Sequence, residues 1–274
     1  MEDRGWVREA AVAGRFYSAN PTSLRNDLEG FFRGAAPEPP TVAIMAPHAG
    51  YVYSGRIAGQ VYRRLKAPQR AIILAPNHTG HGKRISVWSR GTWRTPLGDV
   101  PVDREGAEWL LARLEQPSGD REAHRYEHAA EVHVPFLQFL NPQVEIIPVV
   151  LSALSPETCR RVGEAVAALV KQRPALIVAS TDMSHYIPAR VAKALDKLAL
   201  DRVEAVDGPA LYDVVQRENI SMCGYVPTTC TLEALREMGI SSGELVAYGH
   251  SGEVTGDNES VVGYASARFP SRSP

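Results

Sequence analysis

The 274-residue chain has little cysteine, no long apolar run and no excess of charge of either sign. Three cysteines are too few and odd in number for a disulfide framework, which fits a reducing compartment. Nowhere do about eighteen apolar residues run together, so no membrane-spanning helix is expected. Lys and Arg number 30 against 31 Asp and Glu, a formal net charge of -1, so charge predicts neither nucleic-acid nor membrane-surface binding.

The sequence is also not expected to carry a secretory leader, internal repeats or long linkers. The N-terminus, MEDRGWVREAAVAG, is charged and has no apolar core of secretory length, which with the few cysteines predicts a cytoplasmic protein. No segment repeats with a period of about 20 to 50 residues, which argues against a solenoid. Because 44% of the residues are hydrophobic, residues 1–274 are expected to form a single domain around one core.

Short apolar runs alternate with helical patterns along the chain. Buried strands are expected at 41–46, 71–75, 144–151 and 175–181, and further strands at 245–249 and 260–269. Helices are expected at 20–34, from 57 to about 66, from 103, at 130–140, from 155, and at 189–206, 209–218 and 228–238. Residues 85–89 and 91–95 are expected to pair in antiparallel fashion, and the proline-rich stretch 37–40 to be a connector. This alternation predicts an α/β fold with a central, largely parallel or mixed sheet covered by helices on both faces.

Polar residues follow three of the predicted strands. His48 follows 41–46, His78 follows 71–75, and Asp182 and His185 follow 175–181. In open α/β sheets ligands bind beyond the carboxyl ends of the strands. A single histidine there is commonly just a hydrogen-bonded loop residue. Three strand ends that each carry such groups predict a shared functional cleft.

Cysteine and histidine elsewhere add candidates. Cys223 precedes a predicted helix start, where the helix dipole and a nearby cation would lower its thiol pKa. Cys159 and Cys230 fall within predicted helices and are expected to be small buried side chains. The segment Glu127–Pro135, EHAAEVHVP, misses both the H-E-x-x-H pattern and its inverted form, which argues against a self-contained zinc-protease site.

Within that segment, His128 and Glu131 would share one helix face. With Glu127 they are expected to supply hydrogen-bonding or proton-transfer groups to the cleft, and a surface salt-bridge network is the alternative.

The stretch GHSGE at 249–253 lacks the final glycine of a nucleophile elbow. The glycines of HAGYVYSG form neither a dinucleotide-binding nor a Walker motif.

Seven motifs, in order, carry a family resemblance: APHAGYVYSG, LAPNHTG, WRTPLGDV, EHAAEVHVPFLQ, IIPVVL, STDMSHY and MCGYVPTT. They resemble the Memo family, whose bacterial and archaeal members are also called AmmeMemoRadiSam system protein B. The family's fold is similar to that of the class III extradiol, LigB-type dioxygenases, which are non-haem iron enzymes. The resemblance therefore implies a single α/β domain with a metal-type cleft.

The resemblance also implies site residues. His48, His78 and Cys223 match the family's proposed metal ligands, and Asp182 and His185 match polar residues lining the same pocket. The dioxygenases use two histidines and a carboxylate, whereas this chain has Cys223 at the third position. A thiolate is softer, favours Cu(I), zinc or iron, and is itself open to oxidation.

The leading functional prediction is a metal-binding protein with a dioxygenase-like cleft, acting as an iron or copper oxidoreductase on a small organic substrate. Iron is the first expectation, with copper or zinc as alternatives, and Asp182, His185, His128 and Glu131 are the expected acid–base groups. A second hypothesis is a non-catalytic scaffold that binds a peptide or phosphorylated ligand in the same cleft, and a third is a metal-dependent hydrolase. The family label further implies AMMECR-like and radical S-adenosylmethionine proteins as partners.

Overall fold

The four central apolar runs form parallel strands in the middle of the main sheet. The computed structural model describes residues 6–34, 40–114 and 119–271. The central strands lie side by side in the order β2 (Thr41–Ala46), β8 (Leu176–Ser180), β3 (Arg70–Pro76) and β7 (Glu145–Leu151). Most of their side chains are buried, as expected for strands with helices on both sheet faces.

Antiparallel strands extend the sheet at both edges. These strands are β11 (Val261–Pro270) against β2, β10 (Glu244–His250) against β11, β9 (His185–Ile187) also against β11, and β4 (Ile85–Val87) against β7. The sheet is therefore mixed, with order β10-β11-β2-β8-β3-β7-β4. This confirms the predicted α/β fold with a central mixed sheet.

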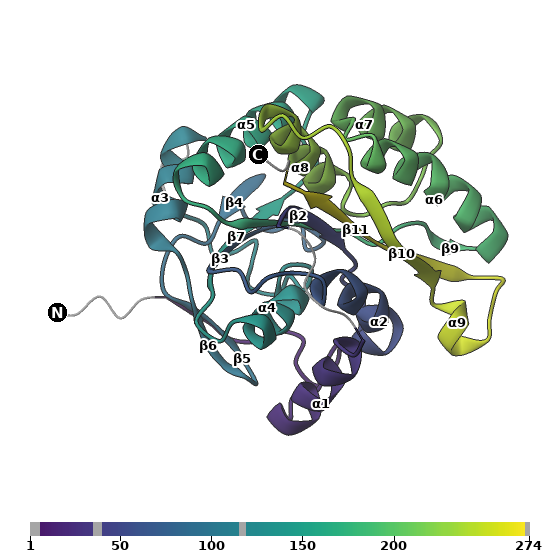
Figure 1. The fold of residues 1–274 in the computed structure, drawn as a ribbon, viewed down its shortest axis with the longest axis horizontal. Helices are drawn as coiled ribbons and strands as arrows, with labels where there is room; N and C mark the ends of the chain where they lie inside the picture. Colours follow the sequence, from purple (N-terminus) through teal and green to yellow (C-terminus); the bar gives the residue numbers. More distant parts are fainter. Residues whose placement is uncertain (1–5, 35–39, 115–118, 272–274) are drawn as a thin grey trace.

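Helices cover both faces of the sheet (Figure 1). One side carries α1 (Pro21–Phe31), α2 (Tyr51–Tyr62) and α4 (Val134–Leu140). The other carries α3 (Arg104–Arg113), α5 (Pro156–Gln172), α6 (Ala189–Glu204), α7 (Gly208–Arg217) and α8 (Tyr225–Glu237), while the short α9 (Gly252–Thr255) follows β10. The expected starts at 20, 103 and 155 are confirmed, because the side chains of Asn20, Asp103 and Ser155 each accept a hydrogen bond from the first turn of their helix. None of the helices in the described part of the chain has the length and hydropathy to cross a membrane.

Two local predictions were wrong. Residues 85–89 and 91–95 do not pair with each other: β4 joins the main sheet, whereas β5 (Thr92–Thr95) pairs with β6 (Gly98–Pro101) and with β1 (Val7–Arg8). The tight turn lies between Thr95 and Gly98. Helix α2 begins at Tyr51, before the expected start at 57, and the backbone N–H of Tyr51 donates to the Phe16 carbonyl. Of the expected connector 37–40, only Pro40 lies within the described residues.

Candidate metal centre

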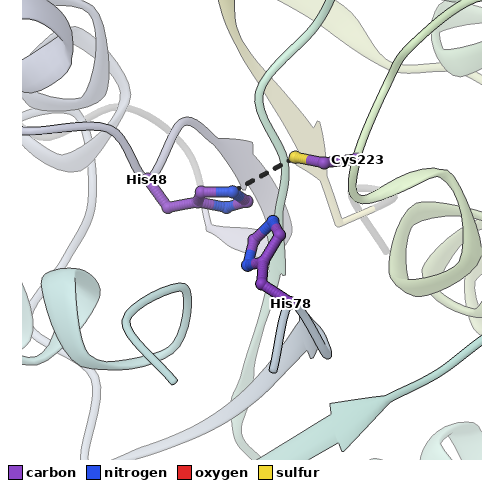
Figure 2. Close-up of side chains that lie close together, drawn as sticks. All are labelled: His48, His78 and Cys223. Carbon is purple, nitrogen blue, oxygen red and sulfur yellow. Dashed lines mark hydrogen bonds between the residues drawn. The ribbon is translucent and has the colours of Figure 1, made fainter. Parts of the chain in front are cut away.

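His48, His78 and Cys223 come together although they are far apart in the sequence. His48 lies between β2 and α2, His78 follows β3, and Cys223 precedes α8. Their candidate ligand atoms all lie within 4.8 Å of one another. Figure 2 shows both imidazole rings and the thiol directed toward a common centre. The structure thus brings together the three residues predicted as metal ligands.

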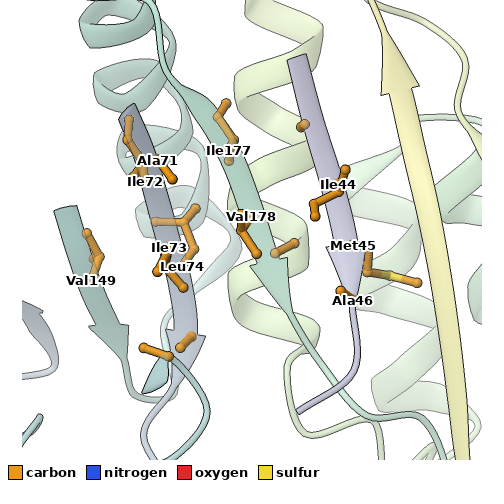
Figure 3. Close-up of a cluster of buried hydrophobic side chains, with 14 of the residues drawn as sticks. Ile44, Met45, Ala46, Ala71, Ile72, Ile73, Leu74, Val149, Ile177 and Val178 are labelled. Atoms are coloured by element: carbon orange, nitrogen blue, oxygen red, sulfur yellow. The ribbon is translucent and has the colours of Figure 1, made fainter. Parts of the chain in front are cut away.

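Parallel strands and one close helix contact produce this convergence. Strands β2, β8 and β3 run in the same direction, so the segments that leave them meet at one edge of the sheet (Figure 3). Gly224, at the start of α8, lies against the end of β8, and its N–H donates to Thr181 Oγ1 at 3.0 Å. A Cβ atom at Gly224 would overlap the Ser180 carbonyl oxygen. The absence of a side chain at Gly224 therefore lets Cys223 approach His48.

His48 is buried and held at both ring nitrogens. Its Nδ1 lies 2.7 Å from Ser180 Oγ, and its Nε2 lies 3.1 Å from Cys223 Sγ. Its backbone N–H donates to Asp182 Oδ1 at 2.8 Å. Burial, reinforced by the nearby His128, lowers the pKa of His48 well below its ordinary value. His48 is therefore a neutral imidazole, which is the form that binds metals.

Glu127 holds His78 in place. The buried carboxylate lies 2.9 Å from His78 Nδ1 through Oε1 and accepts from the His78 backbone N–H at 2.6 Å through Oε2. Burial alone would lower the pKa of His78, but the hydrogen bond and charge of Glu127 outweigh it and raise the pKa. Burial alone would raise the pKa of Glu127, but the hydrogen bond and the charge of His78 outweigh burial and lower this pKa below its ordinary value. A carboxylate that accepts from Nδ1–H leaves Nε2 free to bind a metal.

Glu127 also belongs to a second group of potential ligands. His78, Glu127 and His128 likewise place ligand atoms within 4.8 Å of one another. However, Glu127 Oε1 already accepts from the Ala129 N–H at 2.9 Å besides facing His78. We therefore assign Glu127 to orienting His78 rather than to binding a second ion.

The Cys223 thiol is partly buried and accepts from the Asp182 backbone N–H, with N and Sγ 3.3 Å apart. The sequence predicted that the helix N-terminus would help to lower its pKa. Instead, burial and then the charge of Asp182 raise the pKa of Cys223. The helix dipole is therefore not sufficient to form a thiolate, and a bound cation would have to displace the thiol proton.

Asp182 and His128 lie beside the three candidate ligands. Asp182 Oδ2 is 3.9 Å from His48 Nε2, and burial raises the pKa of Asp182 to about 6 against the opposing hydrogen bond from the His48 backbone. The His128 ring stacks on that of His78, with centroids 4.7 Å apart, and its centroid is 5.4 Å from that of His48. Burial lowers the pKa of His128 to about 4, although Glu127 opposes the shift. Both groups are therefore placed to exchange protons with a ligand in the centre.

Among the described residues, His185 belongs to neither group of potential ligands. Its Nδ1 is 2.9 Å from the Ser221 carbonyl oxygen, and its backbone N–H donates to Ser221 Oγ at 2.8 Å. Ser221 is two residues before Cys223, so His185 connects β9 to the loop that carries the thiol. Within the described residues, its side chain forms no hydrogen bond with His48, His78 or Cys223.

The expected role of Glu131 is not supported. His128 precedes the short 3-10 helix η1 (Glu131–His133), so the two residues do not share a helix face. The Glu131 carboxylate is buried and forms an ion pair with Arg8, with Oε2 and Nη1 2.6 Å apart. Its other donors are the backbone N–H groups of Ala11 and Val12 and the hydroxyl of Tyr17. Glu131 therefore anchors the N-terminal segment, and the alternative of a surface salt-bridge network is also wrong.

Sequence reasoning missed Ser180. This last residue of β8 is buried, and its hydroxyl contacts His48, His133 and the Ala129 carbonyl. A polar residue at the end of an apolar run was the only signal that could have identified it. Cys159 and Cys230 are buried in α5 and α8, as predicted.

Comparison with known proteins identifies the family to which this chain belongs. The family described as Memo-like protein matches residues 8–268. The chain belongs to the Memo-like family. A MEMO1 family protein of Methanothermobacter thermautotrophicus is 40% identical, with 94% of this chain and 99% of the relative covered. One from Aquifex aeolicus is also 40% identical, with 96% and 99% covered.

A solved structure shares the fold of this Memo-like chain. An uncharacterized Escherichia coli K12 protein superposes with a TM-score of 0.58, covering 83% of this chain and 98% of that one. At 17% sequence identity, this likeness supports the fold alone.

The donors of this Memo-like centre fit a transition-metal ion. Two imidazoles and one thiol are borderline to soft ligands, which suit iron, copper and zinc better than magnesium or calcium. A polar group of the protein also lies at Nδ1 of each imidazole, as is usual for histidines that bind metal through Nε2.

Proposed function

We propose that the protein binds a transition-metal ion through His48, His78 and Cys223 and acts as a metal-dependent oxidoreductase on a small organic substrate. The observation that carries the proposal is the approach of three ligand atoms to within 4.8 Å of one another. Iron is the first choice and copper the second. Iron held by three protein ligands would supply one-electron redox chemistry and coordination positions open to a substrate.

The residues around the centre support acid–base chemistry. With a pKa of about 6, the Asp182 carboxyl group is close to the range in which it can both accept and donate a proton near neutral pH. His128 is a neutral imidazole whose side chain is 23% exposed, so a substrate could reach it. We therefore assign proton transfer to Asp182 and His128.

Metal analysis tests the proposal. The protein is purified without oxygen, loaded with Fe²⁺, desalted and analysed for metal content alongside His48→Ala and Cys223→Ala. Wild type should retain about one iron per chain, and each variant should lose most of it, because two protein ligands hold an ion far less tightly than three. His81→Ala, an exposed histidine in the loop after β3, and Cys159→Ala, a buried thiol in α5, should both retain the wild-type content.

Other outcomes favour other functions. Undiminished iron in both His48→Ala and Cys223→Ala would contradict the assigned ligands. A wild-type protein that holds no metal would favour the non-catalytic binding role. Zinc alone at one equivalent, with water in an open position, would favour a hydrolase.

A further inference from the structure

A single buried hydroxyl connects His48 of the candidate metal centre to a second histidine, His133. Ser180 Oγ lies 2.7 Å from the Ala129 carbonyl oxygen, 2.7 Å from His48 Nδ1 and 2.8 Å from His133 Nε2. Ser180 itself is fully buried, as is His133. Every hydrogen bond of this group must therefore be satisfied within the protein.

The Ala129 carbonyl fixes the direction of these hydrogen bonds. A carbonyl oxygen can only accept, and a serine hydroxyl has one hydrogen to donate. If Ser180 donated to either imidazole, two oxygen lone pairs would face each other at 2.7 Å in a buried site. Ser180 therefore donates to Ala129, and both ring nitrogens must donate to Ser180. The hydrogen positions follow from this network: His48 carries one on Nδ1 and His133 carries one on Nε2.

We propose that Ser180 is a positioning residue that holds His48 in the Nδ1–H tautomer, so that its Nε2 lone pair faces the metal centre. That nitrogen is 3.1 Å from Cys223 Sγ. The role of the tautomer in metal binding rests on the proposed function, but the tautomer itself does not.

His133 supports the same arrangement from the other side. With its hydrogen on Nε2, His133 has Nδ1 available as an acceptor, and the hydroxyl of the buried Tyr62 lies 3.0 Å from that atom. Tyr62 thus fixes the orientation of His133, and His133 occupies the second acceptor site of Ser180. The chain of contacts runs from α2 through η1 and β8 to His48.

The two histidine ligands are therefore held differently. The ionised carboxylate of Glu127 faces His78 Nδ1, whereas a neutral hydroxyl faces His48 Nδ1. An ionised carboxylate has no hydrogen to donate, so Glu127 can only accept from His78. Ser180 accepts from His48 only because it donates its single hydrogen to the Ala129 carbonyl. Removing the hydroxyl should thus free the His48 tautomer and leave that of His78 fixed.

Nuclear magnetic resonance tests the tautomer directly. Long-range ¹H–¹⁵N correlation spectra of the protein without added metal should show His48 with its hydrogen on Nδ1. In Ser180→Ala, His48 should populate both neutral tautomers, whereas Ser180→Thr, which keeps the hydroxyl, should restore the wild-type pattern. Ser266→Ala is the matched control, since Ser266 is a buried serine of β11 whose hydroxyl makes no hydrogen bond among the described residues.

Co²⁺ titration of the same variants gives a second readout. Ser180→Ala should bind Co²⁺ about 10- to 100-fold more weakly than wild type, as is typical when a group that orients a histidine ligand is lost. Ser180→Thr and Ser266→Ala should stay within about twofold of wild type, well below the size of that effect.

The two readouts separate the possible failures. A wild-type His48 with its hydrogen on Nε2 would overturn the inference, and so would unchanged Co²⁺ affinity in Ser180→Ala. The wild-type spectrum decides the first point even if a variant fails to fold. If wild type shows the Nδ1–H tautomer and Ser180→Ala loses it, but wild type binds no Co²⁺, the proposed metal function fails and the role of Ser180 in fixing the tautomer stands.

Discussion

Each candidate ligand is held by a different neighbouring group, and the group facing the His78 ring is the ionised carboxylate of Glu127. Replacing Glu127 with Gln preserves shape but removes the charge that faces His78 Nδ1 at 2.9 Å. We expect metal affinity to fall about 10- to 100-fold, because the loss of a charged group that orients a histidine ligand typically has that effect. Co²⁺ titration at pH 8, where protons compete little for the imidazole, measures the change.

The control for this substitution is Glu122→Gln, which removes an exposed carboxylate in the same loop. It should leave the affinity unchanged. A Glu127→Gln variant that folds and binds Co²⁺ like wild type would show that Glu127 does not orient His78.

At the level of residues, sequence position and the family resemblance predicted the candidate ligands and their neighbours Glu127, His128 and Asp182, but not Ser180. His48 and His78 were found because each follows an apolar strand, and Cys223 because it precedes a helix and matches a family motif. The role of Glu131 was mistaken because its partner, Arg8, is 123 residues away in the chain. Such a pairing becomes visible only when the N-terminal segment is placed against η1.

Among the elements, the contact between α8 and β8 determines where Cys223 lies. In Gly224→Ala, the new methyl group would overlap the Ser180 carbonyl oxygen and the Thr181 side chain. The start of α8 would have to move, at a cost of about 1–3 kcal/mol in the free energy of unfolding, typical of overpacking. Cys223 would move with it, so Co²⁺ affinity should also fall.

Chemical denaturation and Co²⁺ titration measure these two effects. Gly30→Ala is the control, since Gly30 is a glycine of α1 with open space where its Cβ would lie. Alanine there should stabilise the protein by about 0.5–1 kcal/mol, the usual advantage over glycine in a helix. Wild-type stability and affinity in Gly224→Ala would contradict the close-contact explanation.

The N-terminal segment depends on the buried pair of Arg8 and Glu131. Glu131→Gln leaves the Arg8 charge buried without its counter-ion, so the free energy of unfolding should fall by about 3–5 kcal/mol. Glu108→Gln, which breaks an exposed ion pair with Arg104 in α3, should cost less than about 1 kcal/mol. Urea unfolding of both variants measures the difference.

The same variant separates an anchoring role from an acid–base role. If Glu131 anchors the N-terminal segment, folded Glu131→Gln protein should retain wild-type Co²⁺ affinity. A variant of wild-type stability with weakened metal binding would instead support the role in the cleft predicted from the sequence.

The element pattern was largely predictable because the strands are buried on both faces. Continuous apolar runs placed the central strands close to their observed bounds. Partner choice was harder for short strands: residues 85–87 and 92–95 lie close together in the sequence, yet one segment joins the main sheet and the other a small separate sheet. Nothing local to either segment specifies that outcome.

On the scale of the whole molecule, the candidate centre requires the complete fold. The main sheet combines strands from residue 41 to residue 270, and its mixed order brings β2, β8 and β3 together despite their separation in the sequence. The sequence predicted the shared edge because parallel strands end on the same side. The metal, the cytoplasmic location and the protein partners stay predictions, because they depend on molecules outside the chain.

Buried neutral histidines should also make the stability of the whole molecule depend on pH. His124 is fully buried between Trp88 and Trp93, and burial, followed by the charge of Arg8, lowers its pKa to about 3. Its unfolded pKa is about 6.5, so the unfolded chain binds more protons below that value. The stabilising contribution is therefore complete above pH 6.5 and is lost progressively as the pH falls toward 3. Within this pH range, the contribution of His124 to the free energy of unfolding changes by up to about 1.4 kcal/mol per pH unit.

Comparing wild type with His124→Gln isolates this contribution from those of other titrating groups. Glutamine can still donate to the Ser86 carbonyl, which lies 3.2 Å from His124 Nε2. The free energy of unfolding, measured by urea denaturation at pH 4.5, 5.5 and 7, should fall less steeply with acid in the variant. The difference in slope should approach about 1.4 kcal/mol per unit below pH 6. Equal slopes, or a His124 ring resonance that titrates near pH 6 in folded wild-type protein, would show that His124 is not held neutral by burial.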